Sequence, residues 1–292
     1  MPKGPKSTSA QVPQHTAEDY DFNSARPVFK PAPEERIADP VCKVRFDLQQ
    51  KPMFSYDPVL CTVVKAPPQS IGEVLRTLQT IQATCIDGDG LKWFNWLYLK
   101  VTQAVEERVA SGGFKDSAWI AELDVRFASL YFSALEGALL RQTTPHCWRI
   151  LFDCRGQTSV ARIQFALAGI NAHINHDLPE AIVATCEARA TTPEHSSQQF
   201  TDYTSLNTTL DSIVESAKRA LHVRLLGEML PPVSHLEDLV AAWGVSAARE
   251  TAWNNAEVLW HLRKARPLDA RFMDTLDGLT TVTNKALLIP VP

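Results

Sequence analysis

The sequence lacks the short motifs that mark several common classes of enzyme. It contains no G-x-G-x-x-G after a strand, no G-x-x-x-x-G-K-[ST], no G-x-S-x-G and no H-E-x-x-H. Dinucleotide-binding, phosphate-loop, serine-hydrolase and zincin chemistry therefore have no support in the sequence. The nearest acidic pair, Asp87 and Asp89, is interrupted by glycines and does not form the D-D-x-x-D face that would hold magnesium on a diphosphate. Ionisation-driven terpene cyclisation is thus disfavoured, and we expect no cofactor.

Long apolar runs and an excess of basic residues are also missing. No stretch approaches the roughly 18 consecutive apolar residues that a membrane span needs, and residues 1–22 lack the apolar core of a secretory signal. The net charge of -4 argues against nucleic acid and anionic lipid as partners. We therefore expect a cytoplasmic protein without a membrane span, whose partner is a small molecule or another protein. The oligomeric state stays open.

The six cysteines do not form a recognisable framework. They are scattered, with no C-x-x-C pair and no histidine at zinc-finger spacing: Cys42, Cys61, Cys85, Cys147, Cys154 and Cys186. This spacing favours buried, reduced thiols over disulfides or structural zinc.

Composition divides the chain into three parts. Residues 1–40 are rich in Pro, Ser, Lys and Glu and show no periodicity, which predicts a disordered tail. In residues 41–68 the prolines at 52, 58, 67 and 68 predict an extended segment that wraps the body of the protein. From residue 69 to 292 the apolar residues recur at helical spacing, with no run of strands and no internal repeat. We therefore predict an all-α fold, a single helical bundle over 69–292, with helices at 204–229, 233–243 and 246–264 among others.

One helical stretch carries an unusual set of polar residues, "GINAHINHDL" at 169–178. On a helical wheel at about 100° per residue, an apolar stripe follows Val160, Ile163, Leu167, Ile170 and Ile174. The wheel places Asn171 and Asn175 on one shoulder of the stripe, His173 and Asp177 on the other, and His176 furthest from it, at the surface. Because His173 and Asp177 are four residues apart, they are expected to form a hydrogen bond in which the carboxylate fixes the imidazole tautomer.

Three interpretations of this stretch are open. The polar residues are satisfied by hydrogen bonds to neighbouring helices, or His173 and Asp177 form an acid–base pair. The third is a metal site, in which His173 joins His176 or Asp177, but the sequence offers no obvious third ligand.

Aromatic residues and single amides recur in other predicted helices. In 246–264, Asn255 falls within an apolar stripe that includes Thr251 and Val258, while Arg249, Trp253, Glu257 and Trp260 follow one another at helical spacing beside it. This ladder predicts either an amphipathic face over the core or the wall of an aromatic pocket. "KWFNWLYL" and "DVRFASLYF" supply further aromatic side chains. The candidate substrate-binding residues are Asn95, Tyr98, Tyr131, Asn175, Arg249, Trp253 and Asn255.

Five segments together resemble a family of small bacterial and fungal helical proteins that carry a domain of unknown function. These are "DGLKWFNWLYLKVT", "LDVRFASLYFSAL", "FALAGINAHINHDLP", "DYTSLN" and "ARETAWNNAEVLWHLR", within residues 69–264. The family motif N-A-H-I-N-x-D-L falls on Asn171, His173, Asn175 and Asp177, and His176 occupies the variable position. Fungal members resemble proteins encoded among terpenoid natural-product genes, one of which, in the sordarin pathway, is a norbornene-forming Diels–Alderase.

The resemblance implies a cofactor-independent cyclase of the Diels–Alderase type, acting on an apolar terpenoid intermediate of fungal secondary metabolism. Such a reaction needs a dry pocket and one or two hydrogen bonds to a carbonyl group. The expected catalytic residues are His173, Asn171 and Asp177: His173, Asn171 or Asn95 would donate to the carbonyl, and Asp177 would orient His173. The alternatives are a metal-dependent hydrolase or lyase that uses His173 and Asp177, and a non-catalytic binding protein for an apolar molecule.

Overall fold

The computed structural model of the protein describes residues 53–226 and 244–290. These residues all belong to one unit, Asp39–Pro292. The predicted tail at 1–40, the first part of the predicted extended segment and the predicted helix at 233–243 lie outside the described residues.

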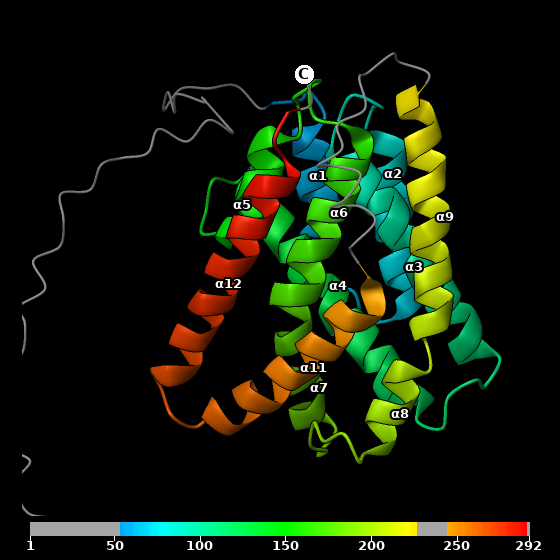
Figure 1. The fold of residues 1–292 in the computed structure, drawn as a ribbon, viewed down its shortest axis with the longest axis vertical. Coiled ribbons are helices and arrows are strands. Elements are labelled where there is room, and N and C mark those ends of the chain that lie inside the picture. The colour runs from blue at the N-terminus through cyan, green and yellow to red at the C-terminus, as the bar shows by residue number, and fades with distance from the viewer. Residues whose placement is uncertain (1–52, 227–243, 291–292) are drawn as a thin grey trace, which may run out of the picture. The chain divides into compact units, whose positions relative to one another are not determined.

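Every regular element in the described ranges is a helix, which confirms the all-α prediction there (Figure 1). The α-helices are α1 (Asp57–Val64), α2 (Ile71–Thr84), α3 (Leu91–Ala110), α4 (Ser117–Leu139), α5 (His146–Cys154), α6 (Arg162–Ala172), α7 (Leu178–Ala188), α8 (Gln198–Thr204), α9 (Asn207–Leu226), α11 (Val245–Leu262) and α12 (Leu268–Leu287). Between α6 and α7 the chain forms one π-helical turn, η1 (His173–Asp177).

The prediction of an extended segment over 41–68 is wrong where the structure describes it, because α1 occupies Asp57–Val64. Pro58 lies in the first turn of α1, where the missing N–H costs no hydrogen bond. The prolines at 67 and 68 come after the helix has ended. A proline therefore starts this helix, and two others follow its end.

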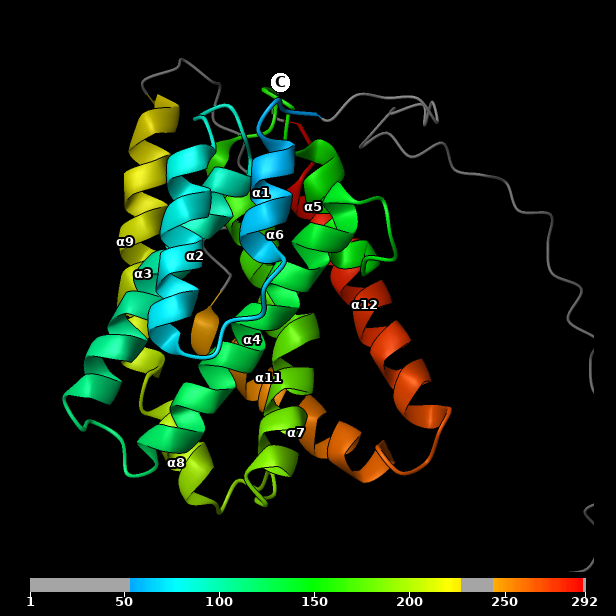
Figure 2. The same cartoon turned by 180° about the vertical axis from the view of Figure 1, so that it is seen from behind.

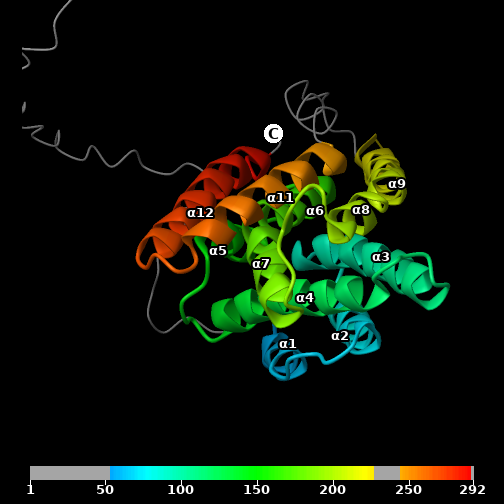
Figure 3. The same cartoon turned by 90° about the horizontal axis from the view of Figure 1, so that it is seen from below.

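α6, η1 and α7 follow one another as a central column. α3 packs against α6 and α4 against α7 on one side of the column, whereas α11 packs against α7 and α12 against α6 on the other. Figure 3 shows this layering from below, with α7 between the two sides. Seen from behind, α1 and α2 lie outside α3 and α4 (Figure 2). Side chains of η1 are consequently enclosed by helices from several directions.

A glycine lets α3 approach the column closely. A Cβ atom on Gly169 would lie 2.3 Å from Cγ of Phe94, nearer than real contacts allow. Gly169 precedes His173 by one turn, so the absence of a side chain here lets the Phe94 ring lie close to the histidine.

An aspartate of α12 fixes the start of α5. Asp277 accepts hydrogen bonds from the backbone N–H groups of His146, at 2.9 Å, and Cys147, at 2.8 Å. These two N–H groups have no partner within their own helix. Asp277 thereby replaces the local cap that Pro145 cannot provide, and it holds α5, with Trp148, against the column.

Candidate functional site

The hydrogen bond that the spacing of His173 and Asp177 predicts is present. Nδ1 of His173 lies 2.9 Å from Oδ2 of Asp177, and each residue is only 2% exposed. Both belong to the π-helical turn, in which the N–H of Leu178 bonds to the carbonyl of His173, five residues earlier. Single π-helical turns are rare and occur often at functional sites.

His176 also bonds to this carboxylate, which corrects its predicted position at the surface. Its Nδ1 atom lies 2.7 Å from Oδ1 of Asp177, and the residue is 8% exposed. The helical wheel assumed 3.6 residues per turn, whereas the wider π turn rotates the residues that follow it. His176 therefore faces inward.

Asp177 is ionised, and the two histidines that bond to it have pKa values shifted in opposite directions. Burial raises the pKa of Asp177, but hydrogen bonds from His173 and His176 outweigh burial, so the pKa lies below its usual value. For His173, burial lowers the pKa more than Asp177 raises it. For His176, burial is outweighed by the hydrogen bond and charge of Asp177, and the pKa is raised. His176 is thus the member of the set that takes up a proton more readily.

The ionised state of Asp177 determines the tautomer of His173. An ionised carboxylate only accepts hydrogen bonds, so Nδ1 of His173 carries the proton that bonds to Asp177. Nε2 of the neutral ring is then an acceptor, and in the described structure it has no hydrogen-bond partner. The expectation that His173 donates to a carbonyl is therefore revised: the geometry makes it a proton acceptor.

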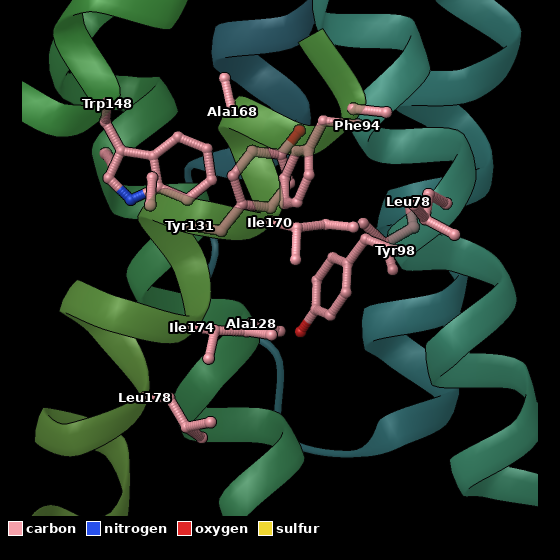
Figure 4. Close-up of a cluster of buried hydrophobic side chains, with 14 of the residues drawn as sticks. Leu78, Phe94, Tyr98, Ala128, Tyr131, Trp148, Ala168, Ile170, Ile174 and Leu178 are labelled. Atoms are coloured by element: carbon pink, nitrogen blue, oxygen red, sulfur yellow. The ribbon is translucent and has the colours of Figure 1, made fainter. Parts of the chain in front are cut away.

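Aromatic rings surround His173 on several sides. The Phe127 ring stacks on it, with centroids 3.4 Å apart and 7° between the planes. The Tyr98 ring meets it edge-on at 4.6 Å, while the Phe94 and Trp148 centroids lie 5.8 Å away. Figure 4 shows Phe94, Tyr98 and Trp148 gathered between the helices. The imidazole consequently lies in an environment of low polarity.

Three further buried polar groups lie on the helices that face His173. The hydroxyl groups of Tyr98 and Thr102, one turn apart on α3, and Oδ2 of Asp124 on α4 have no hydrogen-bond partner among the described residues. Burial, with a smaller contribution from Glu106, raises the pKa of Asp124 to about 7. Burial and the charge of Asp124 raise the pKa of Tyr98 well above its usual value. We define the candidate site as His173, Asp177, Tyr98, Thr102, Asp124 and Phe127.

The structure turns the predicted amide residues of the motif away from this site. Nδ2 of Asn171 donates to Oδ1 of Asn284 at 2.9 Å and to the carbonyl of Thr280 at 3.3 Å. Nδ2 of Asn175 donates to Oδ1 of Asn171, and Asn284 donates to the carbonyl of Cys147, both at 2.9 Å. These bonds connect the column to α12 and α5, so the amides are satisfied by the fold.

The polar groups of two predicted binding residues on α3 and α4 also lie outside the candidate site. Asn95 donates to the carbonyl of Leu78 at 2.9 Å and to Gln82 at 3.0 Å, and so ties α3 to α2. The Tyr131 centroid lies 6.1 Å from that of His173, but its hydroxyl points to the opposite end of the cluster from the hydroxyl of Tyr98 (Figure 4). The Tyr131 hydroxyl is therefore outside the candidate site.

The residues predicted on 246–264 form a separate cluster. Arg249 donates to the carbonyl of Tyr203 at 2.8 Å and to Asn207 at 2.9 Å, and it lies over the Tyr203 ring. The Trp253 ring contacts Tyr203 at 5.0 Å and Phe200 at 5.1 Å.

The buried face of α11 differs from the predicted stripe. It comprises Val245, Arg249, Ala252, Trp253, Ala256 and Leu259. Asn255 is half-buried, Thr251 is exposed, and Val258 is 46% exposed, so the stripe assigned to these three residues is wrong. Hydrophobicity alone misplaced the stripe, because the charged Arg249 is buried and donates to Asn207 and to the carbonyl of Tyr203.

The sequence interpretation did not select Asp124, Thr102, Phe127 or Trp148 as members of a site. Helical spacing does pair Tyr98 with Thr102 and Asp124 with Phe127, because residues three or four apart share a face. Nothing local, however, indicates that the faces of α3 and α4 meet His173.

A second buried charged cluster joins elements distant in the sequence. Arg155, at the end of α5, forms ion pairs with Asp57 of α1 and, at 3.4 Å, with Asp89. Tyr56 donates to Asp89 at 2.9 Å. This cluster ties α1 and the start of α3 to α5, away from His173.

Across 53–226 and 244–290, no three His, Cys, Asp or Glu side chains are grouped as a metal ion would require. None of the helices in these ranges combines the length and apolarity of a membrane span.

The fold and the site define an all-α protein with a buried histidine–aspartate pair. The chain belongs to the group described as Family of unknown function (DUF5995), whose model matches residues 71–290. No curated protein and no solved structure matches the chain.

Proposed function

We propose that the protein is an enzyme in which His173 acts as a general base on an apolar small molecule. The observation that carries this proposal is the Nε2 atom of His173, which is buried and has no partner in the described structure. Its other ring nitrogen is held by ionised Asp177. A base held in the correct tautomer by a carboxylate is a recurring catalytic arrangement.

Asp177 supports the base in two ways. It fixes the Nδ1–H tautomer, and its charge stabilises the imidazolium ion that forms when Nε2 takes a proton. Because the pKa of His173 is lowered by burial, the free base is the resting form near neutral pH. Proton transfer to or from such a group contributes typically about 10²–10⁴-fold to rate.

The surroundings of His173 favour an uncharged, apolar substrate. The rings of Phe94, Tyr98 and Phe127 contact the imidazole, and the ionised carboxylate of Asp177 would repel an anionic substrate. For the reaction we propose ring closure or isomerisation of an apolar terpenoid intermediate, the class that the resemblance to terpenoid-pathway proteins implies. A Diels–Alder cyclisation is the second candidate reaction; it needs no base, and Tyr98 in place of His173 would donate the hydrogen bond to the carbonyl group of the substrate.

Phe127 separates the base from the exterior. The ring stacks on His173 and is partly exposed, whereas His173 is buried. We infer that a movement of the Phe127 side chain admits the substrate to the imidazole. Conformational steps of this kind exclude water from a reaction.

The proposal is tested with 5-nitrobenzisoxazole, a small apolar compound whose ring opens when a base removes one proton. The wild-type protein is compared with His173→Gln and with His195→Gln, the same change at an exposed histidine outside the site. We expect wild type and His195→Gln to open the ring at equal rates, and His173→Gln to lose at least about 100-fold. Equal rates in all three proteins, or no acceleration by the wild type, would contradict the proposal.

A further inference from the structure

Besides the Tyr131 hydroxyl, which points to the opposite end of the cluster (Figure 4), four polar atoms around His173 lack hydrogen-bond partners among the described residues. They are Nε2 of His173, the hydroxyl groups of Tyr98 and Thr102, and Oδ2 of Asp124. All four residues are more than nine-tenths buried, with Asp124 the most exposed at 8%. Buried polar groups are nearly always hydrogen-bonded in native proteins, so a group of four without partners requires an explanation.

Contacts among the side chains place these atoms in one region. The Tyr98 ring lies 4.6 Å from His173 and 6.0 Å from Phe127, and Phe127 lies one turn after Asp124 on α4. The charge of Asp124 raises the pKa of the Tyr98 hydroxyl and the Thr102 side chain lowers it, so the three groups lie close to one another. Three elements, α3, α4 and η1, thus contribute to one polar spot between aromatic rings.

These groups differ in whether they donate a hydrogen bond or accept a proton. Burial keeps Tyr98 protonated, so its hydroxyl is a hydrogen-bond donor. Asp124, whose pKa is about 7, carries its proton on a large fraction of molecules near neutral pH and then donates as well. The charged or titratable groups that face Asp124 are Glu106 and Tyr98, and neither is a cation that would keep it ionised. Two donors therefore lie beside one base.

We propose that Tyr98 and Asp124 hold the carbonyl oxygen of an uncharged apolar ketone or enone, whose neighbouring carbon gives its proton to His173. This inference rests on the proposed function and names its substrate class. A phenol and a neutral carboxyl group in an apolar site stabilise an enolate oxygen well, because charge develops there only in the reaction.

The step balances without a cofactor. As the C–H bond next to the carbonyl breaks, an N–H bond forms at Nε2 of His173. The electron pair moves onto the oxygen and gives an enolate that Tyr98 and Asp124 hold by hydrogen bonds. The imidazolium then returns the proton to another carbon of the same conjugated system, which completes an isomerisation. Alternatively the enolate carbon closes a ring on an enone of the same molecule, and the proton follows.

Binding of 2-naphthol tests the oxygen-holding pair without any turnover. This planar, apolar phenol places an oxygen on a ring system as an enolate does, and its fluorescence reports on its hydrogen bonding. We expect saturable binding by the wild type and a loss of about 10-fold in affinity for Tyr98→Phe and for Asp124→Leu. Asp124→Asn keeps a donor and should recover most of the affinity. The Tyr98 hydroxyl and Oδ2 of Asp124 have no hydrogen-bond partner in the described structure, so these changes break no hydrogen bond that it shows.

Matched controls carry the same chemical changes outside the pair. Tyr131→Phe removes a buried hydroxyl that points to the opposite end of the cluster, and Asp274→Leu changes an exposed carboxylate. Both should bind 2-naphthol as the wild type does. Absence of binding by the wild type, equal affinity in Tyr98→Phe and wild type, or an equal loss in Tyr131→Phe would overturn the inference. Because this binding needs no proton abstraction, its failure is distinguishable from a failure of His173 with 5-nitrobenzisoxazole.

Discussion

Trp148 donates its indole N–H to Oδ2 of Asp177 at 2.9 Å, and this is the oxygen that also receives the Nδ1–H of His173. A side chain of α5 and one of η1 thus share one carboxylate oxygen in the interior of the protein. Trp148, His173 and His176 together give the ionised carboxylate three donors, which offset part of the cost of its burial.

Trp148→Phe should therefore destabilise the protein. The change removes one charge-assisted hydrogen bond to a buried carboxylate, which is worth about 1.5–3 kcal/mol. Urea unfolding measures the loss. Trp253→Phe is the matched control, because the indole N–H of this fully buried residue has no partner among the described residues. Equal losses in the two variants would show that ring size, and not the bond to Asp177, determines the effect.

Gly169→Ala should destabilise the fold, since the added Cβ atom would collide with the Phe94 ring. Overpacking of this kind costs about 1–3 kcal/mol. Gly278→Ala on α12, where a Cβ atom would meet nothing within 4 Å, should stabilise the helix by up to about 1 kcal/mol. The two midpoints of thermal unfolding should shift in opposite directions; a rise for Gly169→Ala would contradict the close packing of α3 on α6.

The Asn171→Ala variant tests whether Asn171 contributes to stability and not to catalysis. Asn171 bonds to Asn284 and Thr280, so its loss leaves buried groups unpaired and should cost about 1–3 kcal/mol in unfolding free energy. At a temperature where the variant is folded, its rate with 5-nitrobenzisoxazole should match the wild type. A large loss of rate in folded protein would restore Asn171 to the catalytic residues that the sequence predicted.

Asp124 should make stability depend on pH. Its pKa is raised from 3.8 to about 7 by burial, so between these values the folded state holds a proton that the unfolded state releases. The folded state is therefore favoured less as the pH rises from about 4, and the penalty is complete above about 7. It amounts to at most about 4 kcal/mol.

The Asp124→Asn variant removes this penalty. Its unfolding free energy should exceed that of the wild type at pH 8 and approach it at pH 5. Chemical denaturation of both proteins across this range makes the comparison. A difference that is independent of pH would show that Asp124 does not carry the proton.

The helical class and much of the site could be predicted because their determinants are local. The helical spacing of apolar residues from residue 69 onward predicted the all-α class, and a separation of four residues predicted the bond between His173 and Asp177. The orientation of His176 could not be predicted in the same way. It depends on one π-helical turn, which changes the angle of every later side chain in that helix.

Contacts between segments distant in the sequence could not be predicted from the sequence either. The cap of α5 comes from Asp277, 130 residues after Cys147, and the amide of Asn171 is satisfied by Asn284, 113 residues away. Such long-range hydrogen bonds determine which polar residues are satisfied by the fold and which are left to bind a substrate. Asp124 and Thr102 therefore emerged as site residues only once α3 and α4 were placed beside η1.

The protonation of His173, followed by 15N NMR of the histidine side chains as the pH is varied, tests the account most directly. We predict an Nδ1–H tautomer for His173, with a pKa below 6.5, while His176 on the same carboxylate titrates above 6.5. His173→Gln and His176→Gln assign the two signals. An Nε2–H tautomer for His173, or a pKa above that of His176, would mean that Nε2 is not a free base and would contradict the proposed chemistry.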